Sequence, residues 1–168
     1  GGIVSSRKPF GIESNFSKFV LSESKTHNIK LYKVGGVGFI EEKDVVSKKE
    51  LIDKIKVIVS KASPGDDTYP HKIISEPIIA LPKSVCTETY LVIDILENEN
   101  QAKNLIKYMK TNFFRFMMSL VKNTQNITKG VFVFVPKLNM DEEWTDEKKK
   151  KKYKLKQDEI DFIATIVK

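Results

Sequence analysis

Few residues in this 168-residue sequence are of the types that carry out catalysis. Cys86 is the single cysteine, and a cysteine nucleophile needs a base that is itself held by a third group. The two histidines, His27 and His71, lie in segments where no such third group is evident. The favoured interpretation of Cys86 is therefore an inert, buried or half-buried thiol. One thiol also makes neither an internal disulfide nor a zinc cluster, so we expect a reducing compartment and no structural metal.

Acidic residues offer only loose matches to nuclease chemistry. A metal-dependent nuclease needs carboxylates and a lysine on adjacent strand positions. The candidates are Glu41-Glu42-Lys43 and the pair Asp66 and Glu76, and neither has the strand-centred pattern. The glycines of Gly35-Gly36-Val37-Gly38 lie between two expected strands rather than between a strand and a helix, which argues against a nucleotide-binding loop. Neither nuclease activity nor cofactor binding is expected.

A polar, basic loop has the residue types that contact nucleic acid. Forked amides can read base edges, whereas lysines and small hydroxyls bind phosphates. Within residues 122–129 these candidates are Lys122, Asn123, Thr124, Gln125, Asn126 and Lys129. The alternative is a simple helix C-cap and turn, because Asn and Thr form local hydrogen bonds in such places. Further candidates flank other loops, where each is equally consistent with a solvated surface residue: Lys61, Ser63, Lys72, Ser84 and Thr87.

The net charge of +7 is carried by the first 140 residues. They contain 21 Lys and Arg against 14 Asp and Glu, whereas the last 28 residues contain 8 of each kind. The tail runs from an acidic stretch at Asp141 to Glu147 into a lysine-rich stretch at Lys148 to Lys156, which is typical of a solvated charge run. The body of the chain is thus basic and the tail neutral.

The elements that would position these residues begin with a hairpin. Residues 31–34 and 37–40 read as two strands joined by Gly35-Gly36. Ser47 followed by Glu50 has capping-box spacing for a short helix. Strands are expected at residues 56–60, 72–81 and 85–95, with a loop over residues 62–69.

A long amphipathic helix is predicted from Asn98 to Val121, with Asn98 as its cap and Gln101 at the third position. Lys103, Lys107 and Lys110 lie on its polar face. Phe114 and Met118 are expected on the same polar side, either as singly exposed residues or as a contact surface for a neighbouring domain. The apolar stripe on the other face comprises Ala102, Leu105, Ile106, Met109, Phe113, Phe116, Met117 and Leu120.

The expected fold is α+β, with one twisted, mostly antiparallel sheet packed on that helix. Residues 1–140 would form the main domain, and residues 141–168 a small helical C-terminal appendage. The start Gly1-Gly2-Ile3 and the lack of any run near the roughly 20 apolar residues of a membrane span favour a piece of a larger cytoplasmic protein.

Several separated stretches, in this order, resemble a known family. They are Ser5-Ser6-Arg7-Lys8-Pro9-Phe10-Gly11, Val85-Cys86-Thr87-Glu88-Thr89-Tyr90-Leu91, Phe113-Phe114-Arg115-Phe116, Lys122-Asn123-Thr124-Gln125, Phe134-Val135-Pro136, Trp144-Thr145-Asp146-Glu147 and Tyr153. The chain resembles the C-terminal target-recognition, or specificity, domain of type IIG-like restriction–modification adenine-specific DNA methyltransferases, which is related to the domains of type I specificity subunits. It departs from them at Lys149-Lys150, where relatives carry an apolar pair, and at Lys156, where they favour a threonine cap.

The resemblance implies a non-catalytic module that reads duplex DNA for a methyltransferase domain N-terminal to it in the parent chain. S-adenosylmethionine, and Mg²⁺ if the parent also carries a nuclease, would belong to that parent enzyme, and no cofactor is expected in this chain. Arg7, Phe114 and Met118 are the residues expected at the interdomain contact. The alternatives are a protein- or RNA-interaction module and a degenerate restriction nuclease domain.

Overall fold

The computed structural model describes residues 8–61 and 76–116. The described residues divide between two compact units, a first unit of residues 8–61 and 76–97 and a second unit of residues 98–116. Mixed α+β structure is present, as predicted, and the domain boundary predicted at residue 140 lies outside the described residues.

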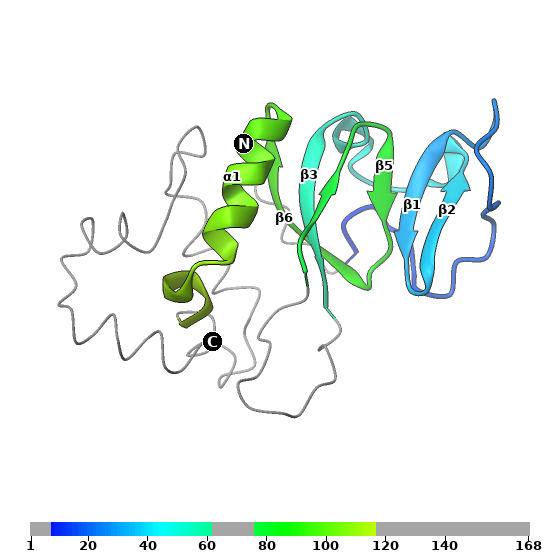
Figure 1. The fold of residues 1–168 in the computed structure, drawn as a ribbon. Coiled ribbons are helices and arrows are strands. Elements are labelled where there is room, and N and C mark those ends of the chain that lie inside the picture. Colours follow the sequence, from blue (N-terminus) through cyan, green and yellow to red (C-terminus); the bar gives the residue numbers. More distant parts are fainter. Residues whose placement is uncertain (1–7, 62–75, 117–168) are drawn as a thin grey trace, which may run out of the picture. The chain divides into compact units, whose positions relative to one another are not determined.

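The first unit contains two three-stranded sheets rather than the single sheet that we predicted (Figure 1). One sheet has the order β2-β1-β5 and the other has the order β4-β3-β6. The β1–β5 pair is parallel, whereas the β1–β2, β3–β4 and β3–β6 pairs are antiparallel. The strands are β1 (Ile29–Lys33), β2 (Gly36–Ile40), β3 (Ile55–Ser60), β4 (Ile78–Ala80), β5 (Ser84–Cys86) and β6 (Tyr90–Leu96).

The β1–β2 hairpin confirms the prediction made from its two central glycines. Gly35 and Gly36 have φ values of 84° and 138°, which only glycine adopts without strain. Gly38 in β2 serves a different purpose, because a Cβ atom at this position would lie 2.8 Å from the Phe19 ring. The absence of a side chain thus lets Phe19 pack directly on the strand.

The stretch predicted as one strand from Val85 to Ile95 is divided by a turn at residues 87–89. The Tyr90 N–H donates to the Thr87 carbonyl (3.1 Å), and the hydroxyls of Thr87 and Thr89 are hydrogen-bonded at 2.6 Å. Hydroxyl side chains that bond locally compete with strand pairing, so the chain turns here. As a result β5 and β6 enter different sheets, and the two sheets share one apolar core.

That core is formed by buried side chains from both sheets and from the segments that precede them. Ile29 and Leu31 alternate with the more exposed Lys30 and Tyr32, as expected for a strand with one face inward. The cluster comprises Phe10, Ile12, Ile29, Leu31, Ile40, Val45, Ile52, Ile58, Ala80, Val85, Cys86 and Val92.

Two short 3₁₀ helices, η1 (Glu42–Asp44) and η2 (Lys49–Leu51), lie between β2 and β3. The capping box predicted at Ser47 is wrong, because the residue before η2 is Lys48, with φ 53°, and it makes no side-chain capping hydrogen bond. A helix this short gains little from a cap.

In the second unit, helix α1 (Glu99–Met109) begins as predicted. The Asn98 side-chain oxygen accepts a hydrogen bond from the Gln101 N–H at 2.9 Å. The helix does not continue to residue 116 without interruption. Thr111 donates its hydroxyl to the Tyr108 carbonyl (2.7 Å) and accepts from the Phe114 N–H (3.2 Å), so helical structure restarts over residues 112–116. Residues 117–121 of the predicted helix lie outside the described residues.

This restart places Phe114 inside the protein. Its side chain has 0% exposure, and its ring lies edge-on to the Tyr108 ring with centroids 5.0 Å apart. The prediction that Phe114 is exposed on the polar side is therefore wrong, because it assumed an unbroken helical period. Of the predicted apolar stripe, Ala102, Leu105, Met109 and Phe113 are buried, whereas Ile106 and Phe116 are only partly so.

No helix among residues 8–61 and 76–116 is both long and apolar enough to cross a membrane.

Candidate nucleic-acid interface

Two of the predicted contact residues are buried rather than exposed. The Ser84 hydroxyl donates to the Leu81 carbonyl at 2.5 Å, and the Thr87 hydroxyl is bonded to that of Thr89. Both side chains have 1% exposure. The expectation that these hydroxyls lie on the surface is wrong, since each stabilises a turn next to β5.

Lys61 is the predicted contact residue that the structure does expose. Its N–H donates to the Thr89 carbonyl at 2.9 Å, so it lies beside the turn between β5 and β6. Ser84 begins β5, at the opposite end of that strand from Thr87. The remaining predicted residues lie outside the described part: Arg7, Ser63, Lys72, Met118, Lys122, Asn123, Thr124, Gln125, Asn126 and Lys129.

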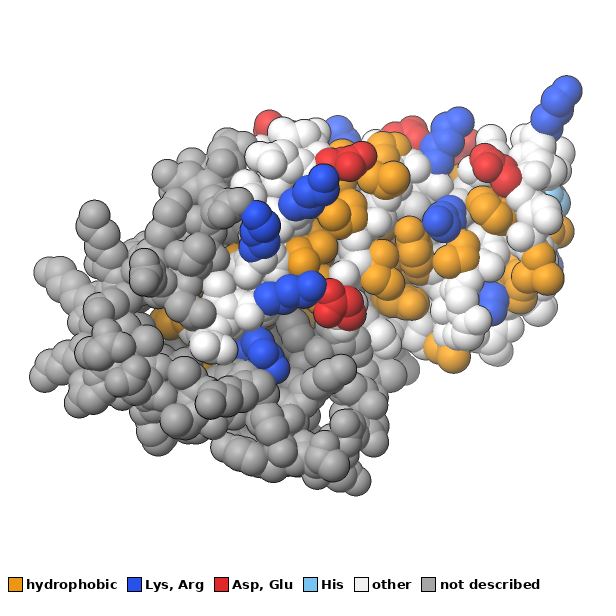
Figure 2. Space-filling model, in the orientation of Figure 1, with side chains coloured by type: hydrophobic (Ala, Val, Ile, Leu, Met, Phe, Trp, Pro, Cys, Tyr) orange, Lys and Arg blue, Asp and Glu red, His pale blue; other side chains and the backbone are white. Residues whose placement is uncertain are grey.

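A row of lysines runs along α1 to Lys110, the residue that follows its last helical position, in the described part of the second unit. Lys103, Lys107 and Lys110 are all exposed, at positions i, i+4 and i+7. In Figure 2 the Lys and Arg side chains gather over the place that α1 occupies in Figure 1. The sequence predicted these lysines on the polar face of the helix, and they were not among the predicted contact residues, because a solvated face has the same pattern. We refer to Lys103, Lys107 and Lys110 as the α1 lysine row.

Among the described residues, Lys56 is a buried cation that serves the fold of the first unit. Lys56 in β3 has 1% exposure, and its ammonium donates to the carbonyls of Leu51, Ile52 and Lys54 at 2.9, 3.2 and 2.7 Å. Burial lowers the pKa of Lys56 from 10.5 to about 8, while nearby Cys86 and Asp53 act in the opposite direction. The ammonium thus satisfies carbonyls at the end of η2.

Cys86 is buried, as predicted. Burial raises the pKa of its thiol to about 12, although Lys56 and Lys61 partly oppose this shift. The thiolate is the reactive form of cysteine, so a thiol that stays protonated at neutral pH is a poor nucleophile. The residue contributes packing in the core cluster.

Of the acidic residues considered for nuclease chemistry, Glu42 lies in η1 and Glu76 precedes β4, so neither is on a strand, and Asp66 lies outside the described residues. Glu41 precedes η1 and is 3.6 Å from the His27 Nε2 and 3.2 Å from the Lys43 ammonium. These charge pairs are partly exposed. The described ranges contain no group of three or more His, Cys, Asp or Glu residues placed to hold a metal ion.

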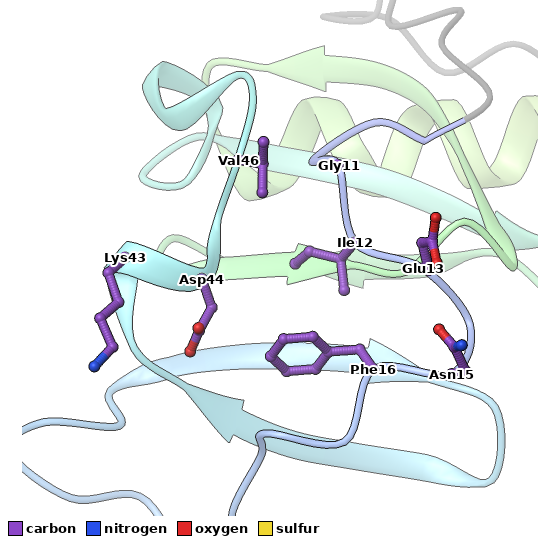
Figure 3. Close-up of a pocket in the computed structure, with 8 residues that line it drawn as sticks. All are labelled: Gly11, Ile12, Glu13, Asn15, Phe16, Lys43, Asp44 and Val46. Atoms are coloured by element: carbon purple, nitrogen blue, oxygen red, sulfur yellow. The ribbon is translucent and has the colours of Figure 1, made fainter.

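A shallow pocket of about 300 Å³ lies between the N-terminal segment and the η1 region (Figure 3). Two charged side chains that line the pocket form salt bridges: Glu13 with Lys8, and Lys43 with Glu41. Phe16 packs on the core cluster. The pocket was not predicted, because its walls come from separate segments: Gly11, Ile12, Glu13, Asn15, Phe16, Lys43, Asp44 and Val46. We assign it no chemistry.

Comparison with protein-family models, with curated proteins and with solved structures finds no match to this chain.

Proposed function

We propose that this chain is the duplex-DNA recognition module of a restriction–modification adenine methyltransferase, and that methyl transfer takes place in another part of the parent enzyme. The observation that carries the proposal is the α1 lysine row. Three exposed cations on one face of a helix provide a surface that can follow a phosphate backbone.

The dimensions and the charge of the second unit fit this role. With a rise of about 1.5 Å per residue, the row extends over about 10 Å. Phosphates of one DNA strand follow one another every 3.4 Å or so along the helix axis, so flexible lysines over that length can contact two or three of them. Residues 98–140 contain seven Lys and Arg against one Glu. Residues 1–97 contain fourteen Lys and Arg against thirteen Asp and Glu. The net charge is therefore +1 for residues 1–97 and +6 for residues 98–140, the part of the chain that begins with α1.

The resemblance noted above supplies the specific part of the proposal. In it, the loop at residues 122–129 reads bases through Asn123 and Gln125, while Lys122 and Lys129 bind phosphates. A helix packed on a sheet, followed by the helical appendage at residues 141–168, is the arrangement that the resemblance implies, and it remains part of the proposal. The parent enzyme would bind S-adenosylmethionine, and the partner of this module would be its methyltransferase domain.

The protein-interaction alternative loses its main support. The contact surface expected at Phe114 and Met118 would have supported it, but Phe114 is fully buried against Tyr108. The same burial removes Phe114 from the expected contact with the methyltransferase domain. Lysine is also depleted at the centres of protein–protein interfaces, whereas it is a common ligand of phosphates.

Replacing all three residues of the α1 lysine row by Gln should weaken binding to every duplex sequence. Binding to a fluorescein-labelled duplex of mixed sequence is measured by fluorescence anisotropy at several salt concentrations. The slope of log K against log salt should become shallower by about three, because each phosphate contact contributes about 0.9 to that slope.

The matched control is the triple variant Lys18→Gln, Lys25→Gln and Lys49→Gln, which removes the same charge from exposed positions of the first unit. Its slope should stay close to that of the unmodified chain. Equal slopes for the two triple variants would show that α1 does not contact DNA.

A further inference from the structure

Two tyrosines from different sheets meet at the surface of the first unit. Tyr32 belongs to β1 and Tyr90 to β6, and their rings lie edge to face with centroids 6.4 Å apart and an angle of 67° between planes. Both side chains pack partly against the core cluster and remain partly exposed. Tyrosine often occupies such places, where its ring is buried and its hydroxyl finds a polar partner.

Two exposed lysines flank this pair. The Lys30 ammonium lies 5.4 Å from the centroid of the Tyr32 ring. Lys61 follows Ser60, which pairs with Tyr90 across the β3–β6 ladder. The Lys61 N–H also donates to the carbonyl of Thr89, the residue that precedes Tyr90, at 2.9 Å. We call Lys30, Tyr32, Lys61 and Tyr90 the tyrosine surface.

The acidic residue nearest to Tyr90 in sequence, Glu88, contacts the N-terminal segment. Glu88, in the turn before Tyr90, accepts a hydrogen bond from the Ser14 N–H at 3.0 Å, and its own N–H donates to the Ile12 carbonyl at 2.9 Å. Burial raises the pKa of Tyr90, so its hydroxyl keeps its proton at neutral pH and can donate to an anion. The tyrosine surface therefore combines cations with hydroxyl donors.

We propose that the tyrosine surface is a second contact for the phosphate backbone of duplex DNA, in addition to the α1 lysine row. The inference rests on the proposed function, because it takes DNA as the partner. Lysine and tyrosine are both residue types that bind phosphate oxygens and fix the register of a protein on a duplex. The two rings are in edge-to-face contact, and side chains that are already packed lose less conformational entropy when they bind a ligand.

The test uses the full 168-residue chain and the same labelled duplex of mixed sequence. The double variant Lys30→Gln and Lys61→Gln should lower the salt slope by about two, because two phosphate contacts are lost. The double variant Tyr32→Phe and Tyr90→Phe keeps both rings and removes only the hydroxyls. It should weaken binding about 3- to 10-fold with little change of the slope, since a hydroxyl contact releases no counterion of its own.

The control Lys18→Gln and Lys25→Gln removes the same charge from the exposed N-terminal segment and should keep the slope unchanged. If both tyrosine-surface variants match this control while the α1 triple variant loses slope, the second contact is wrong and the proposed function stands. If the unmodified chain does not bind duplex DNA, both proposals fail. Retained thermal unfolding midpoints for the variants would exclude misfolding as the cause of weaker binding.

Discussion

Replacing Phe114 by Ala is expected to lower the free energy of unfolding by about 3 to 5 kcal/mol, the range for a large aromatic side chain removed from a core. Phe114 has 0% exposure and contacts Tyr108 edge to face. The substitution removes this ring contact and leaves a cavity that the neighbouring side chains fill only in part. Urea denaturation followed by circular dichroism measures the change.

The matched control is Phe116→Ala, in the same short helical stretch. Phe116 is partly exposed, so its truncation should cost clearly less. The loss of unfolding free energy for Phe114→Leu should lie between those of the two Ala variants. This variant keeps the comparison possible if Phe114→Ala does not fold. A larger loss at Phe116 than at Phe114 would show that the helix after Thr111 presents a different face to the interior.

Replacing Lys56 by Met should lower the free energy of unfolding by about 3 kcal/mol. Methionine retains the length of the apolar stem, but it leaves the carbonyls of Leu51, Ile52 and Lys54 without the donor that Lys56 supplies. The matched control is Lys54→Met, because Lys54 is exposed and its replacement should change stability by less than about 0.5 kcal/mol. Equal stabilities of the two variants would show that the buried ammonium contributes nothing.

The pH dependence of the same pair of proteins gives a second measurement. The pKa of Lys56 is about 8 in the folded chain, against 10.5 for the free side chain. Between these values the unfolded chain holds a proton that the folded chain has released, so the stability of the unmodified protein rises with pH relative to Lys56→Met. The rise from pH 7 to pH 9 should be about 1 kcal/mol. The pKa of the Cys86 thiol is raised from 9.0 to about 12. Its titration therefore lowers the stability of the folded chain as pH rises, but only above pH 9. A fall between pH 7 and pH 9 would contradict this assignment.

The elements that were predicted correctly have strong local signals. Gly35 and Gly36 adopt backbone angles that favour glycine, and Asn98 caps α1 through the side chain that its position indicated. The interruption at Thr111 has no comparable signal. A hydroxyl that bonds to the preceding turn competes with the helix, yet a threonine within an amphipathic pattern is also compatible with an unbroken helix. The error at Phe114 follows directly from this ambiguity.

The candidate interface was predictable only in part for a similar reason. Lys61 was proposed from its place after a strand, and it is exposed. Ser84 and Thr87 have the right chemistry but are buried, because local hydroxyl bonds form the turns on either side of β5. Tyr32 and Tyr90 are far apart in the sequence, and they meet only because β1 and β6 belong to sheets that share a core. Such a juxtaposition depends on tertiary structure that no local pattern encodes.

The most direct test of the central claim is selection of bound DNA from a library of random duplexes, followed by sequencing. A recognition module should enrich one short site over successive rounds, because specific sites bind on the order of 10³-fold or more tightly than other sequences. Retention of duplexes that remain random after the final round, or no retention at low salt, would contradict sequence-specific recognition by this chain.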